Sequence, residues 1–512
     1  MDVHLAQLVR RAAQVRPEGL ATVDDGRERS WREAHERCGR LAAGLRRLGL
    51  EPGDRVSILA QNGDFYVEYY FAVAWAGLVF VPLNNRLAIP EMVHWLTDSG
   101  ARALICDGAH RGIAEELERR TPVEFLIDVT ANGGGLSLPE LLDHREKTPD
   151  LTGGGNDLVG LFYTGGTTGQ SKGVMLSHRN LIVGALDSMY GRDLGQHTRW
   201  LHSAPMFHLS DGSMTVSVTM VAGCHFFIPK FDAADFARAI STHAITNVVC
   251  VPTMFAMLMD HVDTGDADLS SLRGVLYGSA PMPEPLLRRA IGALPQVRFT
   301  QCYGQTEASP VLTILPPEQH AVEAGEMRKL TSVGQATYGC ALRIEDPQGN
   351  PVPAGTVGEI CARGDNVMLG YWRNPQATDH ALGNGWLHTG DAGYLDEDGY
   401  LYLVDRIKDM IISGGENVYC GEVEQALYAH PAIQECAVIG LPDPLWGERV
   451  TAVILPKPGR SVTAQEVIAH CRERIASYKC PKTVIFRDEP FPLSAMGKIL
   501  KTDLRKAYAE TG

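Results

Sequence analysis

The chain lacks an excess of basic residues: its 512 residues include 61 acidic and 47 basic ones, which gives a formal net charge of −14. A protein that binds nucleic acid or anionic lipid along an extended surface needs a net positive charge there. The charge balance therefore excludes an extended nucleic-acid-binding or membrane-binding surface. It leaves room for a local basic pocket that binds a smaller anion.

The sequence also lacks paired cysteines and long apolar runs. Its eleven cysteines are an odd number without any Cys-x-x-Cys pair, which argues against a complete disulfide framework or a structural zinc site and favours a reducing cytoplasm. The longest apolar run, residues 71–83, is too short to span a bilayer and predicts a buried strand or helix segment. Because the N-terminal segment is amphipathic, we do not expect it to be a secretory signal. We therefore expect a cytoplasmic protein without integral membrane association.

What is present is the composition of a large globular protein. Hydrophobic residues make up 45% of the chain and charged residues 21%, which excludes disordered and fibrous classes. At roughly 150 residues per domain, the length predicts about three folding units. From Asp405 to the last residue the chain has 14 basic and 14 acidic residues, so residues 1–404 carry the whole net charge. This change in net charge along the chain predicts a domain boundary near residue 404.

Apolar periodicity predicts alternating helices and strands in the first part of the chain. Ser30 is a candidate N-cap for an amphipathic helix over residues 31–48. Short apolar runs predict parallel strands, separated by helical stretches, at residues 56–60, 78–82, 103–106 and 125–129. The fold class is therefore α/β, with a large N-terminal domain built of α/β subdomains.

The later part of the chain has a different texture. Beyond residue 330, short segments at residues 341–345, 359–363 and 400–404, punctuated by Gly and Pro, predict a small β-rich subdomain. After Asp405 a helix over residues 422–429 and a strand over residues 435–439 indicate a small α+β C-terminal domain. The predicted domains are thus residues 1–404 and residues 405–512.

The most informative segment is LFYTGGTTGQSKGVMLSH at residues 161–178. Its glycines let backbone amides approach oxyanions, its threonines can donate hydrogen bonds, and Lys172 adds a positive charge. This chemistry suits a polyphosphate. The loop is not a Walker A motif, because serine precedes the lysine and glycine follows it. A glycine-rich loop can also be an ordinary turn, so its function depends on further motifs.

Further motifs follow it in a fixed order up to residue 498. They are PMFH (205–208), GSA (278–280), YGQTE (303–307), TGD (389–391), DRIKD (405–409), GGEN (414–417) and GK (497–498). With these segments the chain resembles the adenylate-forming superfamily of acyl-CoA synthetases, luciferases and peptide-synthetase adenylation domains. It looks most similar to bacterial fatty-acid or aryl acid:CoA ligases.

The resemblance implies a reaction in two halves. A carboxylic acid attacks the α-phosphorus of ATP with Mg²⁺, expels pyrophosphate and becomes an acyl-adenylate, which CoA then converts to a thioester. It implies a large N-terminal domain and a mobile C-terminal lid hinged near Asp405. The expected partners are ATP, CoA and a small-molecule acid, without nucleic acid, and the protein is expected to be a monomer or a homodimer.

The resemblance also assigns residues to ATP. Lys498 bridges the carboxylate and the α-phosphate, Glu307 binds Mg²⁺, and these two with Thr164 form the expected catalytic set. The expected ATP and AMP contacts are Thr164, Gly165, Gly166, Thr167, Thr168, Gly169, Lys172, Gly278, Ser279, Ala280, Tyr303, Gly304, Thr306, Asp391, Arg406 and Lys498. From the residues alone, Asp391 and Arg406 could instead be structural ion-pair partners, and residues 278–280 a simple tight turn.

The acid pocket is expected to include His208, Val251 and Gly278. Residues 214–227 and 249–259 are mostly apolar and suit an alkyl chain or an aromatic ring equally. His208 is either a packed core residue or a gate of this pocket. Peptide-synthetase domains usually carry Asp at the position of His208, so we expect an acid without an α-amine.

The expected CoA tunnel and hinge residues are Asp405, Gly414 and Gly415. The sequence departs from the family pattern at residues 419–421, where Tyr-Cys-Gly replaces the common Tyr-Pro-Ala and an exposed Cys420 is one interpretation. We expect neither Cys420 nor Cys361 to be catalytic. Because of this departure, the sequence supports the thioester-forming step less strongly than the adenylation step.

The predicted function is an ATP-dependent and Mg²⁺-dependent acid:CoA ligase for a fatty or aromatic acid. One alternative is an adenylating enzyme with another acceptor, such as a carrier-protein thiol or an amine, or one that activates another small anion such as nitrite. A second alternative is a non-catalytic nucleotide-binding scaffold. The presence of Lys498, Glu307 and Arg406 argues against the scaffold.

Overall fold

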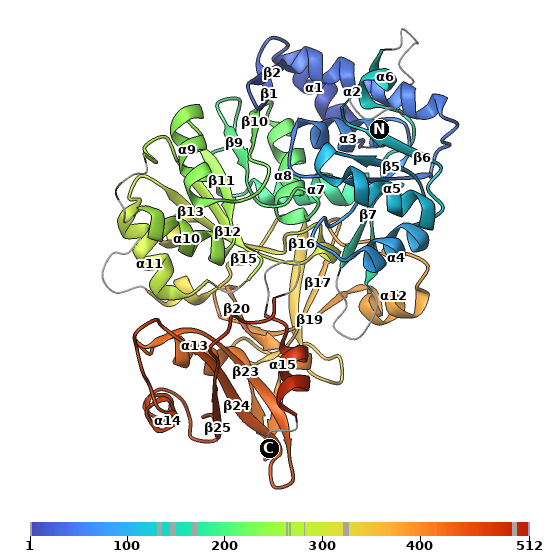
Figure 1. The fold of residues 1–512 in the computed structure, drawn as a ribbon. Coiled ribbons are helices and arrows are strands. Elements are labelled where there is room, and N and C mark those ends of the chain that lie inside the picture. Colours follow the sequence, from blue (N-terminus) through green and yellow to red (C-terminus); the bar gives the residue numbers. More distant parts are fainter. Residues whose placement is uncertain are drawn as a thin grey trace. The chain divides into compact units, whose positions relative to one another are not determined.

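A computed structural model of the protein divides the chain into two compact units (Figure 1). The structure describes residues 3–130, 136–143, 150–164, 171–262, 265, 268–280, 282–320, 327–414, 416–493 and 499–509. Unit 1 comprises Met1–Ala341 and Ala362–Leu387, and unit 2 comprises Leu342–Cys361 and His388–Gly512. Unit 2 is therefore larger than residues 405–512, because it also contains the small β-rich segment. The hinge near Asp405 stays a prediction.

Unit 1 contains a seven-stranded sheet in the order β18-β8-β7-β4-β3-β5-β6. The strands are β3 (Arg55–Leu59), β4 (Val79–Pro82), β5 (Ala101–Cys106), β6 (Phe125–Asp128), β7 (Leu158–Thr164), β8 (Lys172–Ser177) and β18 (Gly370–Tyr371). The pairs from β7 to β6 are parallel, whereas β8 pairs antiparallel with both of its neighbours, β7 and β18. The four predicted strands are confirmed, and three helices supply the crossovers that parallel pairs need: α3 (Asp64–Trp75), α4 (Ile89–Ser99) and α5 (Arg111–Arg120).

The second sheet of unit 1 has nine strands in the order β15-β14-β13-β12-β11-β9-β10-β1-β2. The strands are β1 (Leu20–Asp24), β2 (Arg27–Ser30), β9 (Arg199–His202), β10 (Cys224–Phe227), β11 (Asn247–Cys250), β12 (Gly274–Gly278), β13 (Arg298–Tyr303), β14 (Thr313–Leu315) and β15 (Gln335–Ala336). The central pairs from β13 to β1 are parallel. The carboxyl ends of β11, β12 and β13 therefore meet at one edge, where Val251 and the motifs at residues 278–280 and 303–307 begin.

Helices of unit 1 complete its core. Figure 1 shows α9 (Ala233–His243), α10 (Pro252–Val262) and α11 (Glu284–Ala293) beside strands of the nine-stranded sheet. Phe236, Phe255 and Leu287 from these helices are buried in one cluster with strand residues. The other helices are α1 (Ala6–Val15), α2 (Trp31–Arg47), α6 (Leu138–Leu142), α7 (His178–Ser188), α8 (Leu209–Met220) and α12 (Pro375–Ala381). Ser30 caps α2, as predicted, and the structure adds a reciprocal capping box with Glu33.

Unit 2 contains two sheets. The first sheet has four strands, which lie in chain order: β16 (Cys340–Glu345), β17 (Gly358–Gly364), β19 (Leu387–Leu395) and β20 (Leu401–Arg406). This sheet confirms the predicted β-rich segment. The other sheet is formed by β21 (Ile411–Ser413), β22 (Glu416–Val418), β23 (Ile433–Asp443), β24 (Gly447–Pro456) and β25 (Thr483–Phe486). The helices of this unit are α13 (Cys420–Tyr428), α14 (Ala464–Arg472) and α15 (Lys501–Tyr508). Both the helix predicted at residues 422–429 and the strand predicted at residues 435–439 are present.

Within the described residues, no helix is both long enough and apolar enough to cross a bilayer.

A chain of polar side chains runs through the core of unit 1. Trp200 Nε1 donates to Asp211 Oδ1 at 3.1 Å, and His202 Nδ1 lies 2.9 Å from the same oxygen. His202 Nε2 lies 2.9 Å from His225 Nδ1, and His225 Nε2 lies 3.1 Å from Thr219 Oγ1. Burial lowers the pKa of His225 well below its usual range, so this imidazole is neutral. The network joins β9 and β10 to α8.

We predict that Asp211→Ala destabilises unit 1. The change leaves the buried Trp200 indole N–H and His202 without their acceptor, which costs about 2–4 kcal/mol and lowers the melting temperature. Asp235→Ala is the matched control, because Asp235 is half-exposed and pairs with nearby Arg238. Equal melting temperatures for the two variants in differential scanning calorimetry would contradict the prediction.

Candidate functional site

The glycine-rich loop is anchored by two paired strand ends. Thr164 is the last residue of β7, Lys172 is the first of β8, and the two are partners in the antiparallel register. The predicted contacts Gly165, Gly166, Thr167, Thr168 and Gly169 lie outside the described residues. The structure therefore fixes where the loop begins and ends, at one edge of the seven-stranded sheet.

Lys172 and Glu307 are linked through a side chain that sequence reasoning missed. The Lys172 Nζ atom lies 4.8 Å from the centroid of the Tyr371 ring, and Tyr371 Oη donates to Glu307 Oε1 at 2.8 Å. Burial and the Glu307 charge both raise the pKa of Tyr371, so the phenol keeps its proton and remains a donor. A cation, a phenol and a carboxylate that is only 8% exposed thus lie in a row.

Tyr371 gave no sequence signal because its strand, β18, is two residues long. It pairs with Val174 of β8, from which it is separated by nearly two hundred residues. Such a pairing is a long-range contact without local periodicity. Tyr371 shares the apolar segment MLGYW with core residues, and its polar tip alone does not distinguish it from them.

The ends of β12 and β13 bring the next predicted residues together. Gly278 pairs with Cys302, and a Cβ atom on Gly278 would lie 2.4 Å from the Cys302 carbonyl oxygen. Only glycine fits this approach, which explains the residue type. Tyr303, which follows Cys302, is half-buried. The motifs at residues 278–280 and 303–307 therefore start side by side at the ends of β12 and β13.

The remaining residues of these two motifs lie in turns and in close backbone contacts. Ser279 is exposed with a positive φ of 65°, and Ala280 is half-buried. A Cβ on Gly304 would meet the Pro310 carbonyl oxygen at 2.1 Å, so this position also needs glycine. Thr306 is 8% exposed and starts the 3₁₀ turn that contains Glu307.

His208 is the N-cap of α8. Its Nδ1 atom accepts a hydrogen bond from the Ser210 backbone N–H at 3.1 Å and lies 2.9 Å from Ser210 Oγ. The side chain is half-buried, so it is not a fully packed core residue. Val251, at the end of β11, is also half-buried and packs against the large core cluster. The gate role of His208 stays a prediction.

In unit 2, Asp391 and Arg406 are cross-strand neighbours. They are partners in the register of β19 and β20, and Arg406 Nε lies 3.4 Å from Asp391 Oδ1. The Arg406 side chain is 47% exposed, and a solvated pair of this kind contributes at most about 1 kcal/mol. The ion pair considered from the sequence is therefore present, but it is weak enough for a ligand to compete with it.

The structure shows what Asp405 and Gly414 do locally: the Asp405 side chain accepts backbone hydrogen bonds, and Gly414 has a positive φ. Asp405 Oδ1 accepts from the Arg406 N–H at 2.7 Å, and Oδ2 accepts from the Gly421 N–H at 3.3 Å. Gly414 has a φ of 65°, and a Cβ there would lie 2.8 Å from the Trp446 ring. Gly415 and Lys498 lie outside the described residues.

Cys420 is fully buried, so the interpretation of an exposed thiol is wrong. Its Sγ donates to the Asp409 carbonyl oxygen at 3.0 Å. Burial raises the pKa of the thiol, which removes its nucleophilic character at neutral pH. The side chain packs because α13 begins at this residue and turns it into the core of unit 2.

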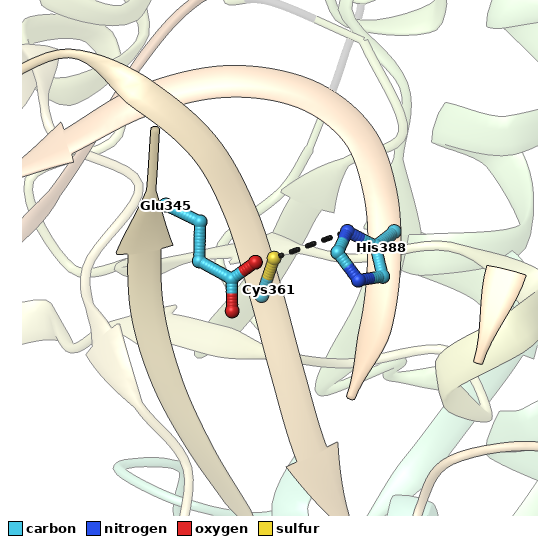
Figure 2. A group of neighbouring side chains, drawn as sticks. All are labelled: Glu345, Cys361 and His388. Carbon is cyan, nitrogen blue, oxygen red and sulfur yellow. Dashed lines mark hydrogen bonds between the residues drawn. The ribbon is translucent and has the colours of Figure 1, made fainter. Parts of the chain in front are cut away.

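Figure 2 shows Glu345, Cys361 and His388 gathered in unit 2. Cys361 Sγ lies 3.5 Å from His388 Nδ1, and their potential ligand atoms all lie within 4.8 Å of one another. However, Glu345 pairs with Arg343, and His388 Nδ1 lies 2.9 Å from Glu359 Oε2. Because these groups already have protein partners, we interpret the cluster as a hydrogen-bond network.

That network supports the turn that carries Asp391. Glu359 Oε1 accepts from the Gly390 N–H at 3.1 Å while its other oxygen faces His388. Asp391 follows directly in the chain. Cys361 is buried in this network, which agrees with its expected packing role.

Comparisons with known proteins identify both parts of the chain. Residues 9–372 match the AMP-binding enzyme family, and residues 422–498 match the AMP-binding enzyme C-terminal domain. A feruloyl-CoA synthase from Amycolatopsis sp is 41% identical over 97% of this chain and 98% of its own length. A fatty acid–[acyl-carrier-protein] ligase from Streptomyces coeruleorubidus is 34% identical over 98% of this chain and 96% of its own.

Solved structures agree with this assignment. The o-succinylbenzoate CoA synthetase from Bacillus subtilis, in complex with its acyl-adenylate intermediate, matches with a TM-score of 0.85 and 30% identity, over 97% of each chain. The predicted superfamily and the α/β fold class are confirmed. The chain belongs to the AMP-binding, adenylate-forming family of enzymes.

Proposed function

We propose that the protein is an ATP-dependent carboxylic acid:CoA ligase. It converts an acid to an acyl-adenylate and then to a CoA thioester. The observation that carries the proposal is the row of Lys172, Tyr371 and Glu307, since it offers a cation and a carboxylate beside the anchored glycine-rich loop. Relatives that are CoA ligases support the same reaction.

The residues of unit 1 fit a nucleotide with its metal ion. Mg²⁺ prefers hard oxygen ligands, and the Glu307 carboxylate is such a ligand. Bound with ATP, Mg²⁺ would offset the charge that builds up on the phosphate oxygens. Tyr371 holds Glu307 Oε1 by its hydrogen bond, so it orients the carboxylate.

In the first half-reaction, a carboxylate oxygen of the acid attacks the α-phosphorus and the bond to the pyrophosphate oxygen breaks. The Thr164 hydroxyl, Lys172 and the loop at residues 165–169 donate to the phosphate oxygens. Lys498 bridges the acid and the α-phosphate. Donors of this kind that are fixed in place each stabilise such a transition state by roughly 3 kcal/mol.

Residues of several motifs recognise the nucleoside. Gly278, Ser279 and Ala280 present backbone to the adenine, and Tyr303 packs on its face, with Gly304 and Thr306 completing the turn toward the phosphates. Asp391 accepts hydrogen bonds from the ribose hydroxyls, and Arg406 donates in the same region. The weak Asp391–Arg406 pair favours these roles, because little stability is lost when a ligand replaces it.

In the second half-reaction, the CoA thiolate attacks the acyl carbon and AMP leaves. Asp405 is the hinge residue, and Gly414 and Gly415 admit the pantetheine arm. The acid carries an aromatic ring, since the feruloyl-CoA and o-succinylbenzoate enzymes are named for such acids. We also propose a reducing, cytoplasmic location, because all eleven cysteines are free thiols and most are buried.

A second candidate acceptor is the thiol of a carrier protein. The 34% identical relative named as a fatty acid–[acyl-carrier-protein] ligase favours it, because its similarity also extends over nearly the whole chain. In that case the acid is a fatty acid and the first half-reaction is unchanged. The two candidates therefore differ in the acid that is activated and in the nucleophile of the second step.

The function is tested by pyrophosphate release with ATP, Mg²⁺ and a panel of aryl and fatty acids. We expect release with at least one aryl acid and a thioester product when CoA is added. Adenylate that accumulates without a thioester, but reacts with a phosphopantetheinylated carrier protein, would favour the second candidate. Absence of pyrophosphate release with every acid would contradict both.

We predict that Lys498→Ala abolishes adenylation but leaves thioester formation from supplied acyl-adenylate largely intact. Lys498 acts on the α-phosphate in the first step only, so the loss is confined to that step. Lys506→Ala is the control, because Lys506 is an exposed lysine of α15. An equal loss in both half-reactions would overturn this division.

We predict that Tyr371→Phe lowers kcat/KM for ATP about tenfold, in line with the loss of one hydrogen bond to a charged group. Tyr371 acts through Glu307, so the variant also needs more Mg²⁺ for half-maximal pyrophosphate release. Tyr478→Phe, at a tyrosine that is 40% exposed, controls for the change of residue type. If the Mg²⁺ dependence stays unchanged, Tyr371 does not position the metal ligand.

A further inference from the structure

Unit 1 holds a buried guanidinium for which the described residues supply no oxygen partner. Arg192 lies in the turn after α7, where its backbone N–H donates to the Met189 carbonyl. Its Nε and Nη1 atoms are buried and make no hydrogen bond to the part of the chain that the structure describes. The third nitrogen, Nη2, faces only the Met214 sulfur at 3.6 Å. Among the described residues, the group has no carboxylate partner.

Such an arrangement is unfavourable for the protein alone. Burying a charged group without a counter-charge or hydrogen bonds carries a large desolvation penalty. The Trp200 ring, whose centroid lies 5.7 Å from the guanidinium carbon, offsets part of this penalty through a cation–π contact. Burial lowers the pKa of Arg192 to about 10, so the group is still charged at neutral pH. A ligand that supplies oxygen acceptors would satisfy it.

The position of Arg192 connects it to the acid pocket. Met214 belongs to α8, the helix that His208 caps, and to the apolar segment expected to line the pocket. Cys302 is close enough for the Arg192 charge to oppose the rise of its thiol pKa, which burial takes to about 11. Cys302 pairs with Gly278 and precedes Tyr303. Arg192 therefore interacts with Cys302, a residue of the β12–β13 pair from which the nucleotide motifs continue.

We infer that Arg192 recognises an oxygen acceptor at the far end of the acid substrate, remote from the carboxylate that is activated. The inference rests on the proposed function and narrows its substrate class. The acid carries either a second carboxylate or a neutral ring oxygen, such as a phenol or methoxy oxygen. A plain alkyl or phenyl acid would leave the guanidinium desolvated and unpaired, and is therefore a poor substrate.

Matched acids separate the two sources of the acceptor. Cinnamic acid has none, 4-hydroxycinnamic and 4-methoxycinnamic acids have a neutral oxygen, and 4-carboxycinnamic acid has a second carboxylate. We expect the wild-type protein to prefer the acceptor-bearing acids by about tenfold or more in kcat/KM for pyrophosphate release. The acid with the highest kcat/KM identifies whether the acceptor is anionic or neutral.

Arg192→Met tests the residue, since methionine keeps an unbranched apolar side chain without the charge. We expect the preference to disappear through a loss of about tenfold on the acceptor-bearing acids, while cinnamic acid is used as well as before. Arg192→Lys should retain part of the preference for the dicarboxylic acid. Arg179→Met is the control, because Arg179 is a partly exposed arginine on α7.

Thermal unfolding gives a readout that does not depend on turnover. Arg192→Met should melt at the same or a higher temperature than the wild type without ligand, because an unpaired buried charge has been removed. Acceptor-bearing acids should raise the melting temperature of the wild type more than cinnamic acid does, and this difference should be absent in the variant. These shifts remain measurable even if the proposed reaction fails.

The outcomes distinguish the inference from the function. Pyrophosphate release that is equal for all acids, or a preference that Arg192→Met does not change, overturns the inference while the ligase function stands. A variant that melts well below the wild type assigns Arg192 a structural role and also overturns it. Absence of release with every acid contradicts the function, and the ligand-induced melting shifts then decide the inference by themselves.

Discussion

The parallel pairing of β12 with β13 is the constraint on which the candidate site depends. The pair brings Gly278 so close to the Cys302 backbone that no side chain fits between them. Tyr303 and the turn that contains Glu307 continue from the end of this pair, and β11 adds Val251 at the same edge. Because the positions are fixed by backbone hydrogen bonds of a sheet, the polar side chains start from a rigid frame.

Elsewhere in unit 1, two cations are held against aromatic rings. Lys172 lies over Tyr371, and Arg192 faces Trp200. An aromatic face attracts a cation without neutralising it, so both charges remain able to attract an anion. This explains how a chain with a net charge of −14 can belong to a family that binds ATP. The overall charge excludes an extended anion-binding surface, whereas recognition of a nucleotide depends on single residues.

Much of the fold was predictable because its signals are local. Buried strands such as β3 and β5 appear as apolar runs between turns, and Ser30 caps α2 through a contact that spans three residues. Residues of the candidate site were predictable only where they belong to a sequence motif of the family. Tyr371 was missed because its strand exists only through pairing with β8. Arg192 was missed because an arginine in a turn is expected to be solvated, and only packing on Trp200 and Met214 buries it.

The sequence by itself determined the family, the order of the motifs and the type of most elements, because residue spacing and turn chemistry are properties of neighbouring positions. The tertiary structure decided which partners the side chains have: Tyr371 for Glu307, a sulfur and a ring for Arg192, and the core of unit 2 for Cys420. These partners are often far apart in the chain. They meet only when sheets and helices pack, and packing depends on the whole set of residues rather than on any local pattern.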